Sequence, residues 1–125
     1  MFLPDLIEFI SADPSVMALL TGGMYHPHLP EDFQIDKNWV VFEYSLMETM
    51  SVQGDKAAMS KYDLSIQTVS QDIIAVEAIA DALKSYLIQY PNDWGIDAYL
   101  TEDSDPDFDA RKKVYYKTLK YNILY

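Results

Sequence analysis

The sequence predicts an α+β domain: an antiparallel or mixed β-sheet with a long helix packed on one face and short helices at the N-terminus. Apolar residues recur every three or four positions in Gln71–Tyr90, and a two-residue alternation runs through Trp39–Met47, Lys61–Val69 and Val114–Leu124. Strands precede and follow the long helix, so a single sheet with that helix on one face is the most economical arrangement. The expected order is α-α-β-β-α-β-β, within one domain spanning residues 1–125.

The long helix is expected to be half buried. Ser70 or Asp72 is placed to cap its start, because either side chain accepts hydrogen bonds from the first free N–H groups. Ile74 and Ile88 fall on its polar side, where they either edge the core or lie exposed and are covered by another chain. The predicted buried stripe comprises Ile73, Val76, Ile79, Ala80, Leu83, Tyr86, Leu87 and Tyr90.

The N-terminal third is expected to hold two short helices and an irregular surface connection. Phe2–Ile10 has apolar residues on one face, and the pair Asp13-Pro14 favours the start of a second helix. Gly22-Gly23 is expected to end it through the left-handed conformation that glycine adopts without strain. Met24-Tyr25 is predicted as a brief edge strand, and the chain from there to Asn38 as irregular.

The remaining segments are less regular in sequence. Glu48–Ser60, with glycine near its middle, is expected to be a turn or a long hairpin tip. Ile96–Thr101 is predicted as a short third strand, followed by an acidic loop over Glu102–Ala110. In the last strand, Lys117 is expected to extend its charge into water over an apolar stem.

Composition excludes several classes of protein. Half of the residues are hydrophobic, which excludes a disordered chain, and the absence of cysteine excludes disulfides and thiolate metal sites. No apolar run has the length of about 20 residues that a membrane span needs. The first residues carry acids where a signal peptide needs positive charge, so we expect a soluble protein, intracellular when made, with no membrane partner.

The charge is strongly negative and unevenly distributed. Nine Lys and Arg residues against twenty Asp and Glu give a net charge of −11, which argues against nucleic-acid binding. Residues 93–109 hold seven acids and no base, whereas 111–120 hold five bases. Either the two segments face each other across a hairpin, or they contact a partner or a neighbouring copy. The candidate contact residues are Asp103, Asp105, Asp107, Arg111, Lys112 and Lys113.

No catalytic or cofactor motif is present. The patterns G-x-G-x-x-G, G-K-[ST], G-x-S-x-G and H-E-x-x-H are all absent, so we expect neither an enzyme nor a cofactor. His26 and His28 flank a proline and, with Glu31 or Asp32, would form the ligand set of a small metal-dependent enzyme; an exposed, proline-stiffened loop explains them more simply.

Alternating aspartates open at Asp103 in the manner of a calcium loop. Such a loop needs Gly at its sixth and Glu at its twelfth position, and here Phe108 and Val114 stand there. A solvated acidic loop is therefore expected, with no metal.

Methionines gather around the predicted hairpin tip. Met47, Met50 and Met59 bracket it, and Val52 lies within it. Because methionine adapts to irregular surfaces, we expect this segment to be a contact arm rather than a filler of the sheet's edge.

Taken together, these segments resemble the tail-completion or tail-terminator family of long-tailed bacteriophages, also called minor tail or head-tail joining proteins. Three short motifs carry most of the resemblance: SADPSVMALL (Ser11–Leu20), TGGMY (Thr21–Tyr25) and WVVFEY (Trp39–Tyr44). The later strand, the alanine-rich helix and the closing strand fit the same layout. The sequence departs from the family at Met24, where arginine is common, and in its acidic loop.

The resemblance implies a structural virion protein of the tail, assembled in the host cytoplasm. Members form a ring, usually a hexamer, on the head-facing end of the tail tube. The implied partners are further copies of the chain, the tail tube protein and the head-tail connector protein, with DNA only as passing cargo. An acidic ring interior would let DNA slide by like-charge repulsion. The charge of −11 also fits an alternative, an acidic DNA mimic that inhibits a host nucleic-acid-binding protein.

Overall fold

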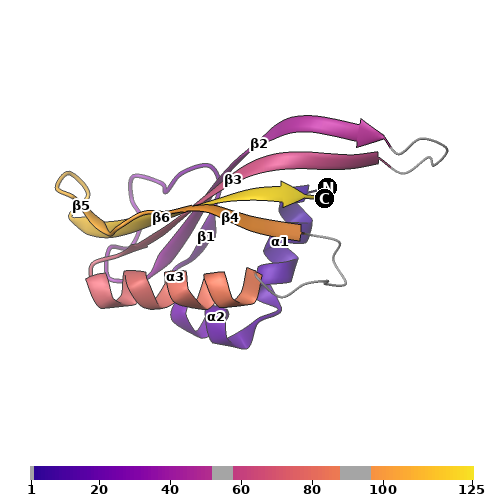
Figure 1. Cartoon of the computed structure of the whole chain (residues 1–125). Coiled ribbons are helices and arrows are strands. Elements are labelled where there is room, and N and C mark those ends of the chain that lie inside the picture. The colour runs from indigo at the N-terminus through magenta and orange to yellow at the C-terminus, as the bar shows by residue number, and fades with distance from the viewer. Residues whose placement is uncertain (1, 52–57, 88–96) are drawn as a thin grey trace.

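The computed structural model describes residues 2–51, 58–87 and 97–125, and shows a β-sheet with helices on one face (Figure 1). The helices are α1 (Phe2–Ser11), α2 (Pro14–Leu19) and α3 (Ile73–Leu87). The strands are β1 (Gly23–Tyr25), β2 (Trp39–Ser51), β3 (Ala58–Ser70), β4 (Asp97–Asp103), β5 (Asp107–Asp109) and β6 (Val114–Leu124). The predicted class and the order of the main elements are confirmed. β1 matches the expected edge strand, and β5 was not expected.

The sheet is mixed. Its strand order is β1-β2-β3-β6-β4, and β5 also pairs with β6. β1 runs parallel to β2, whereas the other pairs are antiparallel. Side chains alternate between faces along each strand, so this register sends one set toward the helices and the other to an open face.

The main core lies between the helices and the sheet. α3 contributes Val76, Ile79, Ala80, Leu83 and Leu87, all buried as predicted. Burying one such large apolar side chain stabilises the fold by about 1.5–3 kcal/mol. The prediction for Ile73 is wrong: it is 43% exposed, because it opens the helix one turn before the first buried residue.

Both predicted capping residues act at the start of α3. The Asp72 carboxylate accepts a hydrogen bond from the Ile74 N–H at 2.9 Å. The Ser70 hydroxyl accepts one from the Asp72 N–H at 3.1 Å and donates one to the Asn38 side-chain oxygen at 2.6 Å. The helix is therefore joined at its first turn to the segment that precedes β2.

Two tyrosine hydroxyls in the main core differ in their surroundings. The Tyr86 hydroxyl donates a hydrogen bond to the Phe9 carbonyl at 2.7 Å, which joins α3 to α1. The Tyr121 hydroxyl is buried without a hydrogen-bond partner among the described residues. Burial, with a smaller contribution from Asp103, raises the pKa of Tyr121 to about 12.

A second apolar cluster lies on the open face of the sheet. It contains Leu29, Trp39, Val41, Val69 and Val114. The Trp39 indole N–H donates to the Gln34 carbonyl at 2.8 Å, which fixes the connection between β1 and β2 against the sheet. This connection is irregular as predicted, but it is only partly a surface segment, because Leu29 is buried.

The glycine pair has a different role from the predicted one. α2 ends at Leu19 with Leu20 as its C-cap, before either glycine is reached. A Cβ at Gly22 would lie 2.4 Å from atoms of the Trp39 ring, so close packing requires glycine there. Gly23 has φ of 120°, a conformation that L side chains rarely adopt.

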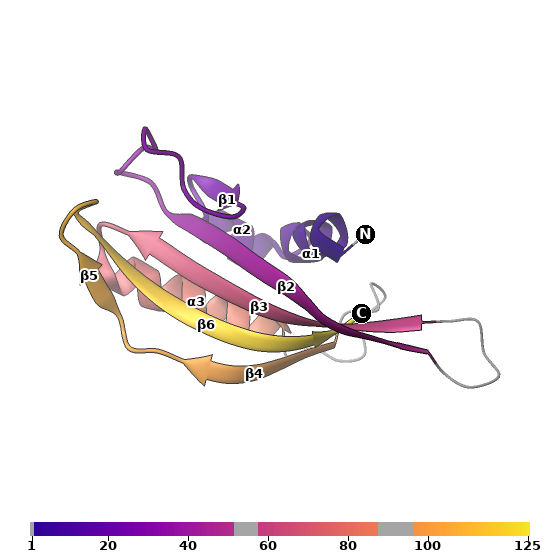
Figure 2. The ribbon, with the colours of Figure 1, turned by 90° about the horizontal axis from the view of Figure 1, so that it is seen from above.

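The expected tip over Glu48–Ser60 is largely strand, and that prediction is wrong for the described part. β2 continues to Ser51 and β3 begins at Ala58, with Met50 opposite Met59 in the ladder. β6 pairs with β3 no further out than Lys61, so the two strands extend beyond the sheet as a hairpin (Figure 2). We call residues 45–51 and 58–61 the arm.

Candidate interaction surfaces

The methionine segment predicted as a contact site lies on the arm. Met47 is 55% exposed, and Leu46 beside it is equally exposed. Met50 and Met59 are ladder partners through their backbones. Val52 lies outside the described residues. The arm is therefore placed for a contact, and its partner remains a prediction.

One of the two isoleucines predicted on the polar side of the long helix lies within the described residues. Ile74 is 74% exposed on α3, so the interpretation that it edges the core is wrong. Ile88 lies outside the described residues.

Asp103, predicted as a contact residue, forms ion pairs within the chain. It lies in β4, which continues past the predicted end at Thr101, because Glu102 pairs with Lys120 and Asp103 with Leu119 in the ladder. Its carboxylate is 2.7 Å from the Lys84 ammonium of α3 and 2.9 Å from that of Lys117 in β6. Glu77 approaches Lys117 at 3.4 Å and Asp81 approaches Lys84 at 3.4 Å. We call these five residues the Asp103 cluster.

The prediction that Lys117 extends into water is also wrong. Its side chain is only 8% exposed, and it lies between Asp103 and Glu77. Burial opposes its charged form, but hydrogen bonding and attraction to Asp103, then to Glu77, outweigh burial and raise the pKa of Lys117. The hydrogen bond from Lys84, followed by that from Lys117, holds the pKa of Asp103 below its usual value. The same bond raises the pKa of Lys84. The cluster therefore joins α3 to β4 and β6 by charge.

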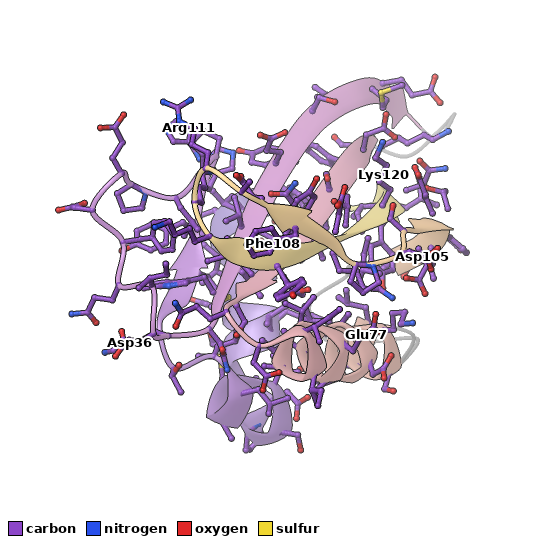
Figure 3. The ribbon with its side chains drawn as sticks, turned by 90° about the vertical axis from the view of Figure 1, so that its left-hand side faces the viewer. Asp36, Glu77, Asp105, Phe108, Arg111 and Lys120 are labelled. Carbon is purple, nitrogen blue, oxygen red and sulfur yellow. The ribbon has the colours of Figure 1, made fainter. Side chains whose placement is uncertain are left out.

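Each of the two interpretations of the charge asymmetry applies to a different part of the chain. Where β4 and β6 pair, opposite charges face each other: Lys120 is 3.4 Å from Glu102, besides the contact of Lys117 with Asp103. Beyond that pairing, no ion pair joins Arg111, Lys112 or Lys113 to a carboxylate among the described residues. These three cations are exposed on the turn before β6, where Arg111 points away from the helices (Figure 3).

The turn that presents these cations is fixed by its own backbone. The Asp109 carboxylate accepts hydrogen bonds from the Arg111 N–H at 3.0 Å and the Lys112 N–H at 3.1 Å. The Lys113 N–H donates to the Asp109 carbonyl at 2.7 Å, and Lys113 has a left-handed φ of 59°. The cations are therefore presented by an ordered turn.

The predicted acidic loop is partly structured. Asp105 is exposed between β4 and β5 (Figure 3). Asp107 belongs to β5, where its carboxylate accepts hydrogen bonds from the Phe108 N–H at 2.8 Å and the Tyr116 hydroxyl at 3.4 Å. The prediction of a loop is wrong for residues 107–109, which form an exposed strand paired with β6.

The two histidines lie in different surroundings. The His26 ring lies 5.0 Å from the Tyr44 ring, centroid to centroid. His28 lines a groove on the open face. Over the described ranges, no group of three or more His, Asp or Glu side chains is arranged to hold a metal ion.

A groove of about 550 Å³ lies on the open face. The segments that line it, the β1–β2 connection and the turn before β6, lie at the end of the sheet away from the arm (Figure 2). Pro27, His28 and Leu29 form one side, and the turn from Phe108 to Lys112 forms the other. Its floor comprises Val41, Val69, Val114 and Tyr116, with Glu43 and Gln67 toward the middle of the sheet. A second hollow of about 660 Å³ adjoins it and reaches Arg111. We call the first hollow the end groove; no local pattern in the sequence predicts it.

Comparisons with known proteins address the fold. No family model matches the chain, and no curated protein matches it in sequence. One similar solved structure is a chain described as "Virion of native gene transfer agent (GTA) particle", with a TM-score of 0.66 and 14% sequence identity. The superposition covers 94% of this chain and 88% of that chain. At this identity the likeness shows a shared fold.

None of the helices in the described ranges is both long enough and apolar enough to cross a membrane.

Proposed function

We propose that this chain is a structural virion protein that forms a ring of six copies on the head-facing end of a phage tail tube. There it stops tube polymerisation and provides the surface on which the head-tail connector docks. In this role the chain is not an enzyme, and its partners are other copies, the tube protein and the connector.

The observation that carries the proposal is the likeness of fold to a chain of a virion particle. It extends over 94% of this chain and 88% of the other, so it concerns the whole layout rather than one common motif. The motifs SADPSVMALL and WVVFEY independently resemble tail-completion proteins. The fold and the sequence motifs therefore support the same class of role.

The geometry also suits a ring. The arm and the end groove lie at opposite ends of the sheet (Figure 2), so two different surfaces are available for neighbouring copies. A contact between two different surfaces is heterologous, and heterologous contacts generate closed rings when the rotation closes.

The test is the mass and shape of the purified chain, alone and with tail tubes. Light scattering is expected to give six times the monomer mass, alone or after tubes are added, and negative-stain images are expected to show a ring at one end of each tube. Tubes polymerised with the chain present are expected to stop growing at the capped end. A chain that stays monomeric and leaves tube growth unchanged would contradict the proposal.

A further inference from the structure

The arm is uncovered on both faces. Every residue from Ser45 to Thr49 is exposed, and Leu46 and Met47 are each 55% exposed. The Ser60 backbone forms hydrogen bonds with the Tyr125 backbone. From Ser60 toward the tip of the hairpin, β2 and β3 pair only with each other among the described strands. The register shifts between Leu46 and Glu48, so Leu46 and Met47 lie at an irregularity at the base of the projecting hairpin. Two adjacent large exposed apolar side chains there indicate a contact surface.

The end groove offers a complementary surface. Phe108, which is 47% exposed, lines one side above a floor of largely buried valines, and Lys112 stands at its rim with Arg111 in the adjoining hollow. Neither cation forms an ion pair within the described part of the chain, and the carboxylate of nearby Asp109 is directed to its own turn. The groove therefore suits a partner segment that has apolar side chains followed by an acid.

The arm has this composition. Leu46 and Met47 are followed by Glu48, which is exposed and lies opposite Lys61 in the ladder, without an ion pair among the described residues. The groove has the volume of a pocket that takes several side chains. The polarity and the charge of the two surfaces are thus complementary.

One copy cannot bring its own two surfaces together. Val41 of the groove floor and Met47 of the arm lie on the same strand, β2. A strand rises about 3.3 Å per residue, which places them about 20 Å apart along a hydrogen-bonded ladder. The groove is therefore open to the arm of another copy only.

We propose that the arm of one copy docks in the end groove of a second copy. Leu46 and Met47 cover the apolar floor, and Glu48 faces Arg111 and Lys112. This inference rests on the proposed function, because the contact repeats head to tail and is the contact that closes the ring.

Cross-linking tests the contact directly, because the chain contains no cysteine. The test variant carries Met47→Cys and Ala110→Cys, both at exposed positions. With a short bis-maleimide we expect a ladder of covalent oligomers that ends at the copy number of the ring. The control variant carries Met47→Cys and Ile74→Cys, the latter exposed on the helix side, and is expected to give no ladder.

The outcomes separate the contact from the ring. If light scattering shows a ring but the test variant gives no ladder of cross-linked oligomers, the arm contact is overturned and the ring remains. No assembly of the wild-type chain, alone or with tubes, would overturn both proposals.

Charge reversal gives a second measurement. Glu48→Lys is expected to weaken assembly about tenfold at low salt, since it places like charges together at every contact. Adding Lys112→Glu is expected to restore assembly, whereas adding Lys37→Glu is not. At 1 M salt, where the Debye length is about 3 Å, the differences are expected to vanish. Restoration by both second changes would overturn the assigned pairing.

Discussion

Replacing Asp103 with asparagine tests whether the Asp103 cluster stabilises the fold. The change keeps the size of the side chain and removes its charge, so the Lys117 ammonium, 8% exposed, keeps only Glu77 at 3.4 Å. Removing one partner of a buried pair costs 3–5 kcal/mol, and losing an exposed pair costs about 0–1 kcal/mol. The Asp103 side chain is 32% exposed, between these limits. We expect a loss of about 2 kcal/mol in the free energy of unfolding.

Lys117→Met tests whether the cost of Asp103→Asn comes from the unpaired Lys117 ammonium. Methionine has a similar length and removes the buried charge itself, while Asp103 keeps Lys84 at 2.7 Å. This change is expected to cost less than about 1 kcal/mol, because the carboxylates left behind, Asp103 at 32% and Glu77 at 40% exposed, are partly solvated, so no buried charge remains unpaired. In the Lys117→Met background, Asp103→Asn is expected to lose about half of its effect. Asp81→Asn, at a position 68% exposed, is the control with little effect.

The assay is urea unfolding with thermal melting as a check. For a chain of this length, 1 kcal/mol corresponds to about 4 °C, so Asp103→Asn is expected to melt about 8 °C lower. If Lys117→Met costs as much as Asp103→Asn, or if the two effects add fully, the buried unpaired ammonium is not the cause and the reasoning is refuted.

The pH dependence follows from the direction of the pKa of Asp103. Its lowered pKa in the folded chain means that its contribution is present at neutral pH, above its unfolded pKa of about 4. The contribution is lost as the pH falls below that value, through the folded pKa. The stability difference between the wild-type chain and Asp103→Asn is therefore expected to shrink from pH 5 downward and to persist between pH 5 and 8.

Two further changes test the packing of the core. Tyr121→Phe is expected to be neutral or stabilising, because it removes a buried hydroxyl without a partner in the described chain. Tyr86→Phe is expected to lower the free energy of unfolding by about 0.5–1.5 kcal/mol, because it removes a hydrogen bond. Equal effects of the two changes in chemical denaturation would contradict this. Gly22→Ala is expected to cost about 1–3 kcal/mol, because the new Cβ meets the Trp39 ring, and less than half of that in a Trp39→Leu background.

The long helix and the central strands could be predicted because each buries one face. Burial of Val76 and Leu83 imposes a helical period on α3, and burial of Phe42 imposes alternation on β2. The arm has no buried face over Ser45–Thr49, so its sequence carries no such period and resembles a turn. β5 was missed because its two aspartates are unfavourable in strands.

The interaction surfaces were less predictable, because their parts come from distant places in the chain. Lys117 meets Glu77 from 40 residues away, and the end groove joins Leu29 to the turn at Lys112. No local pattern encodes either juxtaposition. Exposure of Ile74 was one of two interpretations left open, since an apolar residue on a polar arc is compatible with both.

The register of β4 and β6 explains why both interpretations of the charge asymmetry are partly correct. Lys120 lies opposite Glu102 in the ladder and is neutralised within the chain by an ion pair at 3.4 Å. Arg111 and Lys112 lie on the turn, beyond the residues of β6 that pair with β4. They have no strand opposite them and are available to another molecule. Position relative to the ladder, rather than the number of charges, thus decides which residues stabilise the monomer. Reversing Lys112 should therefore act on assembly, and changing Lys117 should act on folding.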